Sequence, residues 1–560
     1  MPRIAVLCTL GLLVSCSPDP LQSPDYSILN LPEQPNILWL VAEDLSPYLA
    51  AYGDSTVHTP NLDRLSHEGV TYTNMYSVSG VCAPSRFSIA TGIYTTTGFA
   101  QHMRTTMRAE YHEETGVPPY EAVPPPAVRF MSEVLRQHGY YATNNAKQDY
   151  QLKAPVTAWD NSSNRAHWRQ RPPGTPFFAV FNFGVTHESQ VWARADDSLW
   201  VPTDLGVPIP PYLPLTGPVH RDVRRMYSNL MLLDERIGTV LIQLEEGGLL
   251  DETVIFFYAD HGGPLPRQKR QLYDSGLHVP LLVRFPHAQL AGLQDDQLIS
   301  FVDLAPTTFS LAGITLPDYL EGQAFLGSQR ADAPRAYIHA AADRFDTEYD
   351  TKRAVRDKRF KYIRNLRPDR GYYLAVSYRE QMATMQELLR LQAEGNLNKA
   401  QAQWFRDAKA EEELFDTWDD PHELRSIATD TAFAGKLLEL RQELDRWMEQ
   451  TQDPGVLDER EMVEGIWPDM VQPVTSPPVI AYEGRAVVLS SSTAGASIGY
   501  QLLLEGEAPG SAWQVYTGPL FLSDNVTLSA VAHRLGYTPS DTVTFASPYS
   551  SQPGRYSRVR

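Results

Sequence analysis

Short runs of consecutive apolar residues recur through the first half of the chain. The four clearest runs are Asn36–Ala42, Phe177–Phe183, Thr253–Ala259 and Val279–Phe285. Uninterrupted apolar runs of this length are typical of strands that are buried on both faces of a sheet. The pattern therefore predicts a large sheet whose two faces are both covered.

Apolar positions at helical spacing lie between these runs. One such face consists of Met226, Leu230, Leu233, Ile237, Val240 and Leu244, at alternating intervals of four and three residues. Gly247 and Gly248 end this helix, and Gly139 ends a second helix predicted over Ala127–His138. Strands that alternate with helices predict an α/β fold, here a large, mostly parallel sheet flanked by helices over residues 35–330. In such sheets, functional side chains gather at the carboxyl ends of the strands.

The pattern changes beyond residue 330. Strand-like runs at Ala336–Ala342, Arg353–Arg356 and Arg359–Asn365 are followed by helical patterns at Gln381–Gln392 and Gly435–Gln450. They predict a smaller C-terminal α+β subdomain over residues 331–455. A proline-containing, acidic stretch over residues 456–478 is interpreted as a linker.

Serine, threonine and glycine are frequent from residue 479 onward, between short alternating runs. These runs are Ala486–Ser490, Ile498–Leu504, Trp513–Val515 and Val526–Ala532. They predict a terminal antiparallel β-sandwich over residues 479–548, followed by a tail over residues 549–560. This module resembles the β-sandwich at the end of some chitobiases and hexosaminidases, where it would be either a spacer or a surface that contacts carbohydrate.

The amino terminus has the pattern of an export signal. A charged start is followed by the apolar run Ile4–Val14, which is much shorter than the roughly 20 residues that span a bilayer. The run ends Leu-Val-Ser-Cys at Cys16, which resembles a bacterial lipobox. The resemblance implies a signal peptide over residues 1–16, a lipid on Cys16, a tether over residues 17–34 and an outer-membrane, cell-surface or periplasmic location. The alternative is a plain signal peptide with an incidental cysteine.

Composition narrows the classes of function. The 560 residues suit two to four domains, and 48 basic against 67 acidic residues leave a formal charge of −19, which argues against a nucleic-acid binder. An anionic substrate is still allowed, because charges more than about 8–10 Å away are largely screened at physiological salt. After removal of the signal peptide, Cys82 is the one cysteine in the body of the chain. An exported chain with one such cysteine has no disulfide framework, so the residue needs another explanation.

The segment from Cys82 to Gly92 supplies that explanation. It reads C-A-P-S-R-F-S-I-A-T-G, with Arg86 near the start of a helical stretch, and helix N-termini and arginines both favour anions. The string resembles the sulfatase signature C-x-P-S-R-x4-T-G at every fixed position. The resemblance implies that Cys82 is converted to formylglycine by a formylglycine-generating or anaerobic maturation enzyme. It also implies a fold of the alkaline phosphatase superfamily.

Carboxylates follow two of the predicted strands. Glu43 and Asp44 come directly after the first strand, and Asp260 and His261 directly after the third. By resemblance, these four residues and residue 82 would hold Ca2+, which prefers oxygen ligands. Glu43 stands where the family usually has Asp, and His261 where Asn is frequent. The alternative is that no metal binds here and the carboxylates only cap backbone N–H groups.

Three more residues match active-site positions of the family. His187 ends the segment from Phe181 to His187 and is assigned to protonation of the leaving group, with sulfate binding as the alternative. Lys269 follows the metal strand and is assigned to the sulfate, with Arg270 as the neighbour that could substitute. Lys147 matches the lysine of G-K-x-H, although Asp149 replaces the histidine of that motif.

Three residues complete the expected substrate-binding set. His102 is a candidate for the missing histidine contact, and Arg104 lies two residues further on. Arg344, in the smaller sheet, is a candidate for contact with the sugar. A solvated surface loop is the alternative for His102 and Arg104.

The resemblance implies a complete mechanism for cleavage of a sulfate ester. The hydrated formylglycine attacks sulfur, while Ca2+, Arg86, Lys147 and Lys269 stabilise the sulfuryl oxygens and His187 protonates the leaving oxygen. The second hydroxyl of the hydrated aldehyde then expels sulfate, which an ordinary serine ester could not do.

The surroundings of Asp44 and His187 are similar to the bacterial heparan N-sulfatase-like branch of the family, whose members act on sulfated polysaccharides. The expected substrate is a sulfated carbohydrate, either an ulvan-type algal polymer or a heparan-type glycosaminoglycan. Two alternatives are a phosphodiesterase or phosphonate monoester hydrolase of the same superfamily, and a catalytically dead glycan-binding protein on the cell surface.

Overall fold

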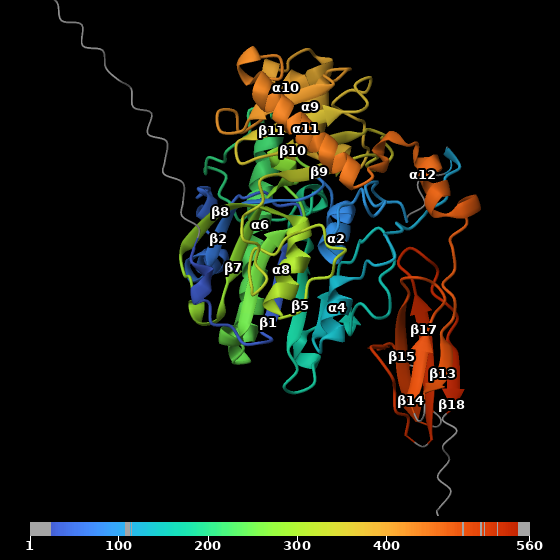
Figure 1. Ribbon diagram of the computed structural model, residues 1–560. Helices are drawn as coiled ribbons and strands as arrows, with labels where there is room; N and C mark the ends of the chain where they lie inside the picture. Colours follow the sequence, from blue (N-terminus) through green and yellow to red (C-terminus); the bar gives the residue numbers. More distant parts are fainter. Residues whose placement is uncertain are drawn as a thin grey trace, which may run out of the picture.

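The computed structural model describes residues 24–546, except for residues 107–112, 114, 484, 485, 505, 506, 509 and 524 (Figure 1). The predicted signal peptide, Cys16 and the tail over residues 549–560 lie outside the described residues. Among the described helices, none combines the length and apolar composition that a membrane crossing requires.

An eight-stranded sheet forms the centre of the molecule, with the strand order β4-β3-β5-β1-β6-β7-β2-β8. The strands are β1 Asn36–Ala42, β2 Val70–Tyr76, β3 Tyr141–Asn145, β4 Asn161–Ser162, β5 Phe177–Phe183, β6 Thr253–Ala259, β7 His278–Arg284 and β8 Leu293–Ser300. Strands β4, β3, β5, β1 and β6 pair in parallel, and β7 is antiparallel to both of its neighbours. The predicted α/β class with a mostly parallel sheet is confirmed.

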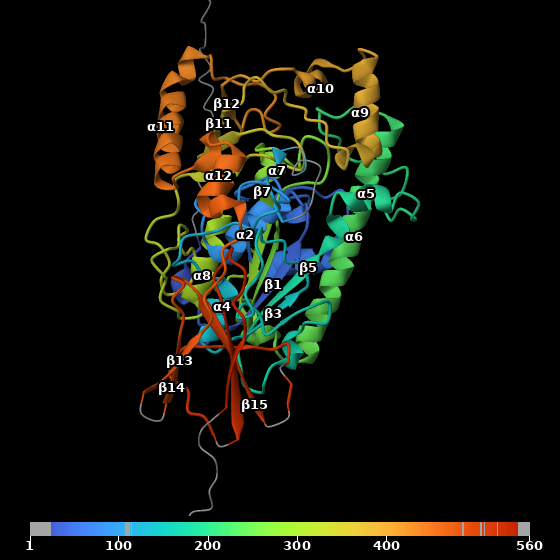
Figure 2. The ribbon, with the colours of Figure 1, turned by 90° about the vertical axis from the view of Figure 1, so that its right-hand side faces the viewer.

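Helices cover both faces of this sheet. Long helix α6 lies on one face, and α2, α4 and α8 lie on the other (Figure 2). The helices of this domain are α1 Pro60–Glu68, α2 Cys82–Thr91, α4 Met131–Gln137, α5 Ser189–Ala193, α6 Gly217–Glu246, α7 Asp274–Leu277 and α8 Leu304–Leu311. Strands β1 and β6 are buried at every position, as their uninterrupted apolar runs predict.

The strand directions determine where the site can form. Because β7 is antiparallel to both β6 and β2, strand β2 runs in the same direction as β6. The segments after β1, β2, β3, β5 and β6 therefore all leave the sheet at the same edge. This is the edge at which α/β sheets place their functional groups.

The C-terminal subdomain packs over the segments at this edge. Its antiparallel sheet has the order β12-β11-β10-β9, with β9 Ile338–Ala342, β10 Lys352–Arg356, β11 Phe360–Asn365 and β12 Glu412–Asp416. Its helices are α9 Ala383–Ala393, α10 Lys399–Ala402 and α11 Ala434–Gln450. Lys361 donates to the Leu272 carbonyl at 3.0 Å, and Arg270 pairs with Asp346 at 2.8 Å. The subdomain is thus tied directly to the segment that follows β6.

The terminal module is antiparallel throughout. Strand β13 Val479–Glu483 pairs with β14 Ala486–Ser490, and a second sheet contains β15 Ser497–Leu504, β16 Gln514–Val515, β17 Val526–His533 and β18 Val543–Ala546. The module lies beside α4 (Figures 1 and 2). There the Ser497 hydroxyl donates to Glu133 at 2.5 Å, and Arg136 donates to the Trp513 carbonyl at 2.6 Å.

Three expected segments differ from the structure. The helix predicted over Ala127–His138 begins only at Met131, because Phe130 is extended. The predicted linker contains helix α12 Glu459–Ile466, which packs on Val117 and Tyr120. The described part of the predicted tether is also packed, since the buried Tyr26 donates to Asp295 at 2.7 Å. Both connecting segments bury apolar side chains that are too few to give a clear periodic pattern.

Candidate active site

Five segments at the carboxyl edge of the sheet bring their polar side chains to one place. Asp44 follows β1, Lys147 follows β3, His187 follows β5, Asp260 follows β6, and Cys82 begins α2 after β2. The carboxylates, the thiol and the histidines form two overlapping groups whose ligand atoms lie within 4.8 Å of one another. The sequence places these residues up to about 200 positions apart, and the parallel sheet brings them together.

Asp44 is the most highly connected of these residues and is fully buried. Its carboxylate accepts from Lys269 Nζ at 2.6 Å and from the Glu188 N–H at 2.8 Å, and it lies 3.0 Å from His261 Nε2. Burial by itself would raise the pKa of this carboxyl. The surrounding cations, of which Lys269 acts most strongly, lower its pKa well below the usual value. Asp44 is therefore held as a carboxylate.

Cys82 lies between these charged groups, at the first position of α2. Its Sγ is 3.3 Å from His261 Nε2, 3.7 Å from Lys269 Nζ and 3.9 Å from an Asp44 oxygen. Burial would raise the pKa of the thiol, but Lys269 and Lys147 outweigh it and lower the pKa to about 7. The side chain of residue 82 is thus placed in a cationic field at a helix N-terminus, which favours an anion.

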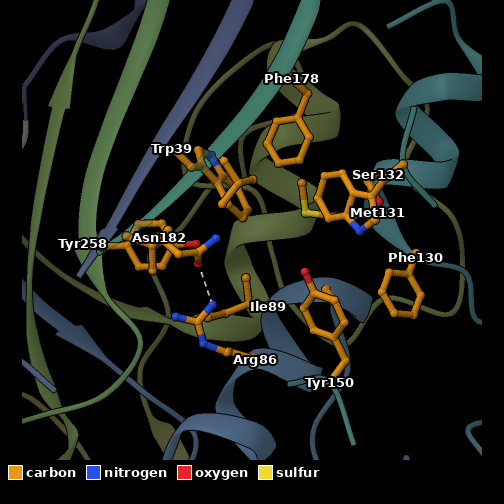
Figure 3. A pocket seen from close by; sticks show the side chains of 14 residues that line it. Trp39, Arg86, Ile89, Phe130, Met131, Ser132, Tyr150, Phe178, Asn182 and Tyr258 are labelled. Carbon is orange, nitrogen blue, oxygen red and sulfur yellow. Dashed lines mark hydrogen bonds between the residues drawn. The ribbon is translucent and has the colours of Figure 1, made fainter. Parts of the chain in front are cut away.

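Arg86 lies on the same helix, one turn further on. Its Nε donates to Asp260 at 2.9 Å, and its Nη1 donates to Asn182 at 2.7 Å, as Figure 3 shows for the second bond. Behind Arg86 is a small cavity of about 30 Å³, lined mainly by rings such as Trp39 and Tyr258. These rings keep water away from the side of the guanidinium that faces the cavity. The low polarity there strengthens its interactions with Asp260 and Asn182.

Glu43 and Lys147 form an ion pair beside the cysteine. Their Oε2 and Nζ atoms are 2.7 Å apart, and both side chains are largely buried. Glu43 therefore reaches the lysine after β3 with its extra methylene, and its remaining oxygen faces Gly184. Asp149, which replaces the histidine of the family motif, is 3.9 Å from the same lysine. Two of the three departures from the family pattern, Glu43 and Asp149, thus meet at Lys147.

His187 and Lys269 form a second pair beside Cys82. The His187 ring is placed between Ser189, 2.9 Å from Nδ1, and Lys269, 3.1 Å from Nε2. Burial and Lys269 lower the pKa of His187, but Asp44 and Cys82 outweigh them, and the pKa is raised in total. The raised pKa favours uptake of a proton, as a group that donates one requires, whereas in this arrangement Nε2 accepts from the Lys269 ammonium and Nδ1 accepts from the Ser189 N–H.

The sequence did not reveal Glu188, Asp346 or Asn182 as members of the site. Glu188 is fully buried and receives Arg270 through both of its oxygens at 2.8 Å, with Lys269 at 3.3 Å. Asn182 lies within the strand-end segment that carries His187, and Glu188 follows it directly. This proximity in sequence is the one signal that could have indicated them as site residues. No sequence signal indicated Asp346, which comes from the C-terminal subdomain.

Two expected substrate contacts, His102 and Arg344, have structural partners instead. Both are almost completely buried, and His102 Nδ1 accepts the backbone N–H of Arg344 at 3.3 Å. The Arg344 guanidinium binds Glu459 through two bonds of 2.7 Å. The structure therefore does not support the substrate-binding assignment of these two residues. The sequence could not show that α12 supplies a carboxylate to Arg344.

Arg104 differs from these two residues because about a third of its side chain is exposed. It pairs with Asp346 at 2.7 Å and lies over the ring of Tyr378, 5.4 Å from the centroid. Arg104 is therefore still a candidate for contact with substrate.

The donor set at this edge fits a divalent metal ion. Asp44, Asp260, His261 and residue 82 form one of the two groups of converging ligand atoms. Burial would lower the pKa of His261, but the surrounding negative charges, led by Asp44, raise it to about 10. A buried site that gathers this much negative charge around a proton suits a bound cation, and its carboxylates suit a hard one.

The Glu43–Lys147 pair generates a prediction about stability. We expect Glu43→Gln and Lys147→Met each to lower the free energy of unfolding, because each leaves a largely buried charge without its partner. The double variant should lose less than the sum, with a coupling of about 0.5–3 kcal/mol. Denaturant unfolding of the four proteins measures this coupling, and strictly additive losses would contradict the pair. Arg194 and Asp197, a more exposed pair at 2.8 Å, serve as the matched control cycle.

Comparison with protein families gives two matches. The model described as Sulfatase matches residues 35–173 and 160–314. The model described as N-sulphoglucosamine sulphohydrolase, C-terminal, matches residues 267–394. Together they cover both the α/β domain and much of the C-terminal subdomain, including the segments that carry the site.

Individual proteins show the same relationship. An ulvan-active sulfatase of Formosa agariphila is 48% identical over 583 aligned positions, which cover 97% of each chain. Human N-sulphoglucosamine sulphohydrolase is 25% identical over 76% of this chain and 93% of its own length. The solved structure of BT4656 with D-glucosamine-2-N,6-O-disulfate has a TM-score of 0.53 at 17% identity, over 76% of this chain and all of that one, and thus shares the fold. On these grounds the chain belongs to the sulfatase family, and it is a sulfuric ester hydrolase.

Proposed function

We propose that this sulfatase removes sulfate groups from an ulvan-type sulfated polysaccharide. The observation that carries the proposal is the position of Cys82 at a helix N-terminus. Around it lie three cations, Lys147, Lys269 and His261, and two carboxylates, Asp44 and Asp260. The 48% identity to an ulvan-active sulfatase over nearly the whole chain supports ulvan over a heparan-type polymer. An intact set of charged groups supports catalysis over mere glycan binding.

Residue 82 would act after conversion of its thiol to formylglycine by a maturation enzyme. The hydrated aldehyde supplies a hydroxyl nucleophile and, through its second hydroxyl, a route for the release of sulfate. Glu43, Asp44, Asp260 and His261 would hold Ca2+ beside this residue, and Glu43 also pairs with Lys147. A bound Ca2+ would polarise the sulfate oxygens.

The remaining residues have roles that follow from their positions. The charges of Lys147 and Lys269 both act on residue 82, and Arg86 lies one turn along the same helix. They are placed to bind the sulfate oxygens and to stabilise the negative charge that develops on them. His187 has a raised pKa and lies beside residue 82, where it is placed to take up a proton and deliver it to the leaving sugar oxygen.

The first test is the release of inorganic sulfate from purified ulvan and from heparan sulfate by the matured enzyme. We expect release from ulvan, and Cys82→Ala should lower kcat/KM by several orders of magnitude because it removes the nucleophile. Mass spectrometry of the peptide that carries residue 82 reports whether maturation has occurred.

An aryl sulfate and an aryl phosphate diester, assayed at equal enzyme, form the control for reaction class. Faster hydrolysis of the diester would contradict the assignment of sulfate esters as the substrate. A matured sample that releases no sulfate from ulvan would contradict the proposed polymer.

The proposed metal site predicts that Ca2+ stabilises the folded enzyme. Removal of Ca2+ with a chelator should lower both Tm and activity, and added Ca2+ should restore both. At a concentration of 100 Kd the expected stabilisation is about 2.7 kcal/mol. Asp260→Asn should abolish the Ca2+-dependent shift in Tm, whereas Asp369→Asn, at an exposed position, should retain it. An unchanged shift in the Asp260 variant would contradict these ligands.

We also propose that Cys16 carries a lipid that anchors the enzyme to the outer membrane or cell surface. The basis is the lipobox-like sequence that ends at this residue. In a bacterial host, Cys16→Ser should move the enzyme from the membrane fraction to the soluble exported fraction. Cys8→Ser, within the predicted signal peptide, should leave the distribution unchanged. Membrane association that survives Cys16→Ser would contradict lipidation at this residue.

A further inference from the structure

Three side chains form a connected group that reaches His187 through the ring of Tyr378. The Tyr378 ring lies 6.4 Å from the His187 ring and 5.1 Å from that of Trp192, between centroids. The Arg104 guanidinium lies over the same tyrosine at 5.4 Å. We call Arg104, Trp192 and Tyr378 the aromatic–arginine wall.

The wall is assembled from three parts of the chain that are distant in sequence. Trp192 lies on α5, directly after the segment that carries His187, and Arg104 follows α2. Tyr378 comes from the C-terminal subdomain, next to the short 3-10 helix Arg379–Gln381. The wall therefore exists only where the subdomain meets the carboxyl edge of the sheet.

The two aromatic residues of the wall lie at the edge of the core, where Trp192 packs against it. Both side chains are only partly buried, whereas rings of the central sheet, such as Trp39 on β1, are almost completely enclosed. Half-exposed aromatic rings beside a reactive centre suit an amphipathic ligand such as a sugar, whose C–H face is apolar and whose rim is polar.

Arg104 supplies the charged part of the wall. Asp346 pairs with Arg104 at 2.7 Å and with Arg270 at 2.8 Å, so one carboxylate orients two guanidinium groups. Among the described residues, no hydrogen bond is donated by the Nη atoms of Arg104. These atoms keep the planar donor geometry that binds oxyanions through two bonds.

Around Arg104, the guanidinium groups of Arg104, Arg270 and Arg379 outnumber the carboxylates of Asp346 and Glu188 by one. Arg379 is buried nearby, and burial and the charge of Arg270 lower its pKa to about 10. Burial would raise the pKa of Asp346, but Arg270 and Arg104 lower it to about 2, so its charge persists. An excess of positive charge beside a half-exposed arginine favours an anionic ligand.

We propose that the aromatic–arginine wall binds the sugar at the active-site mouth, with its ring against Tyr378 and Trp192 and an oxyanion of the polymer on Arg104. The oxyanion is a uronate carboxylate or a second sulfate, which share the same recognition chemistry. This inference rests on the proposed function, since it concerns the specificity of that reaction. It gives the C-terminal subdomain a direct part in choosing the substrate.

The test compares kcat/KM for ulvan with kcat/KM for a small aryl sulfate, which has neither a second sugar nor an oxyanion. Arg104→Gln and Tyr378→Ala should each lower the polymer-to-aryl ratio by about tenfold to a hundredfold, mainly through KM for the polymer. Tyr378→Phe should keep most of the ratio because it retains the ring. Arg104→Lys should recover little of it because it keeps the charge without the planar donor pair.

Arg359 and Trp418 provide the matched control. Arg359 also pairs with a carboxylate, Asp416, and lies over the Trp418 ring at 5.1 Å, but no contact links this pair to His187. Arg359→Gln and Trp418→Ala should therefore leave the ratio unchanged. Retention of the ratio in both wall variants, or an equal loss in the control variants, would overturn the proposal.

Chemical reduction of the carboxyl groups of ulvan distinguishes the two oxyanions. If Arg104 binds a carboxylate, the reduced polymer should lower kcat/KM for the wild type and have no further effect on Arg104→Gln. If Arg104 binds a second sulfate, the difference between wild type and variant should persist on the reduced polymer. A wild type that is inactive on ulvan contradicts the proposed polymer, whereas an active wild type with insensitive wall variants contradicts only this inference.

Discussion

The buried carboxylate of Asp44 is the interaction on which the site depends. A carboxylate without solvent is unstable unless it is paired and hydrogen-bonded, and Asp44 is surrounded by Lys269, His261 and the Glu188 N–H. These partners come from the segments that follow β5 and β6. The same carboxylate therefore holds three strand ends around Cys82 and sets the charge of the space next to it.

Alternating charges extend from this carboxylate to the surface. Lys269 lies between Asp44 and Glu188, and Glu188 in turn receives Arg270, which shares Asp346 with the half-exposed Arg104. Each buried charge in this series has an opposite neighbour, which offsets the cost of its desolvation. The series crosses from the α/β domain to the C-terminal subdomain and thus keeps the two parts in one arrangement. The proposed recognition of substrate by Arg104 and the chemistry at residue 82 would be linked by the same set of ion pairs.

Two of the three departures from the family pattern, at positions 43 and 149, meet at one lysine. Glu43, longer than the usual aspartate by one methylene, reaches Lys147, and Asp149 approaches the same lysine instead of a histidine. The cation at this position is kept, but its surroundings are more acidic. Two carboxylates therefore orient Lys147, whereas Lys269 lies against His187.

The sequence by itself determined the α/β class, the chief strands and the residues that follow them. Continuous apolar runs specify buried strands, and the motif from Cys82 to Gly92 is local, so neither depends on distant contacts. The sequence also identified Asp44 and Asp260 as strand-end carboxylates, because a parallel sheet places such ends along one edge.

Only the tertiary structure decided which polar groups face the site. His102 and Arg344 were indistinguishable from Arg104 in the sequence, yet α12 and the subdomain enclose the first two and leave the third exposed. Glu188 and Tyr378 gave no clear signal of their own, since their roles come from neighbours that are distant along the chain. Burial and charge compensation depend on all the elements that meet at one point, and a local pattern of residues does not contain that information.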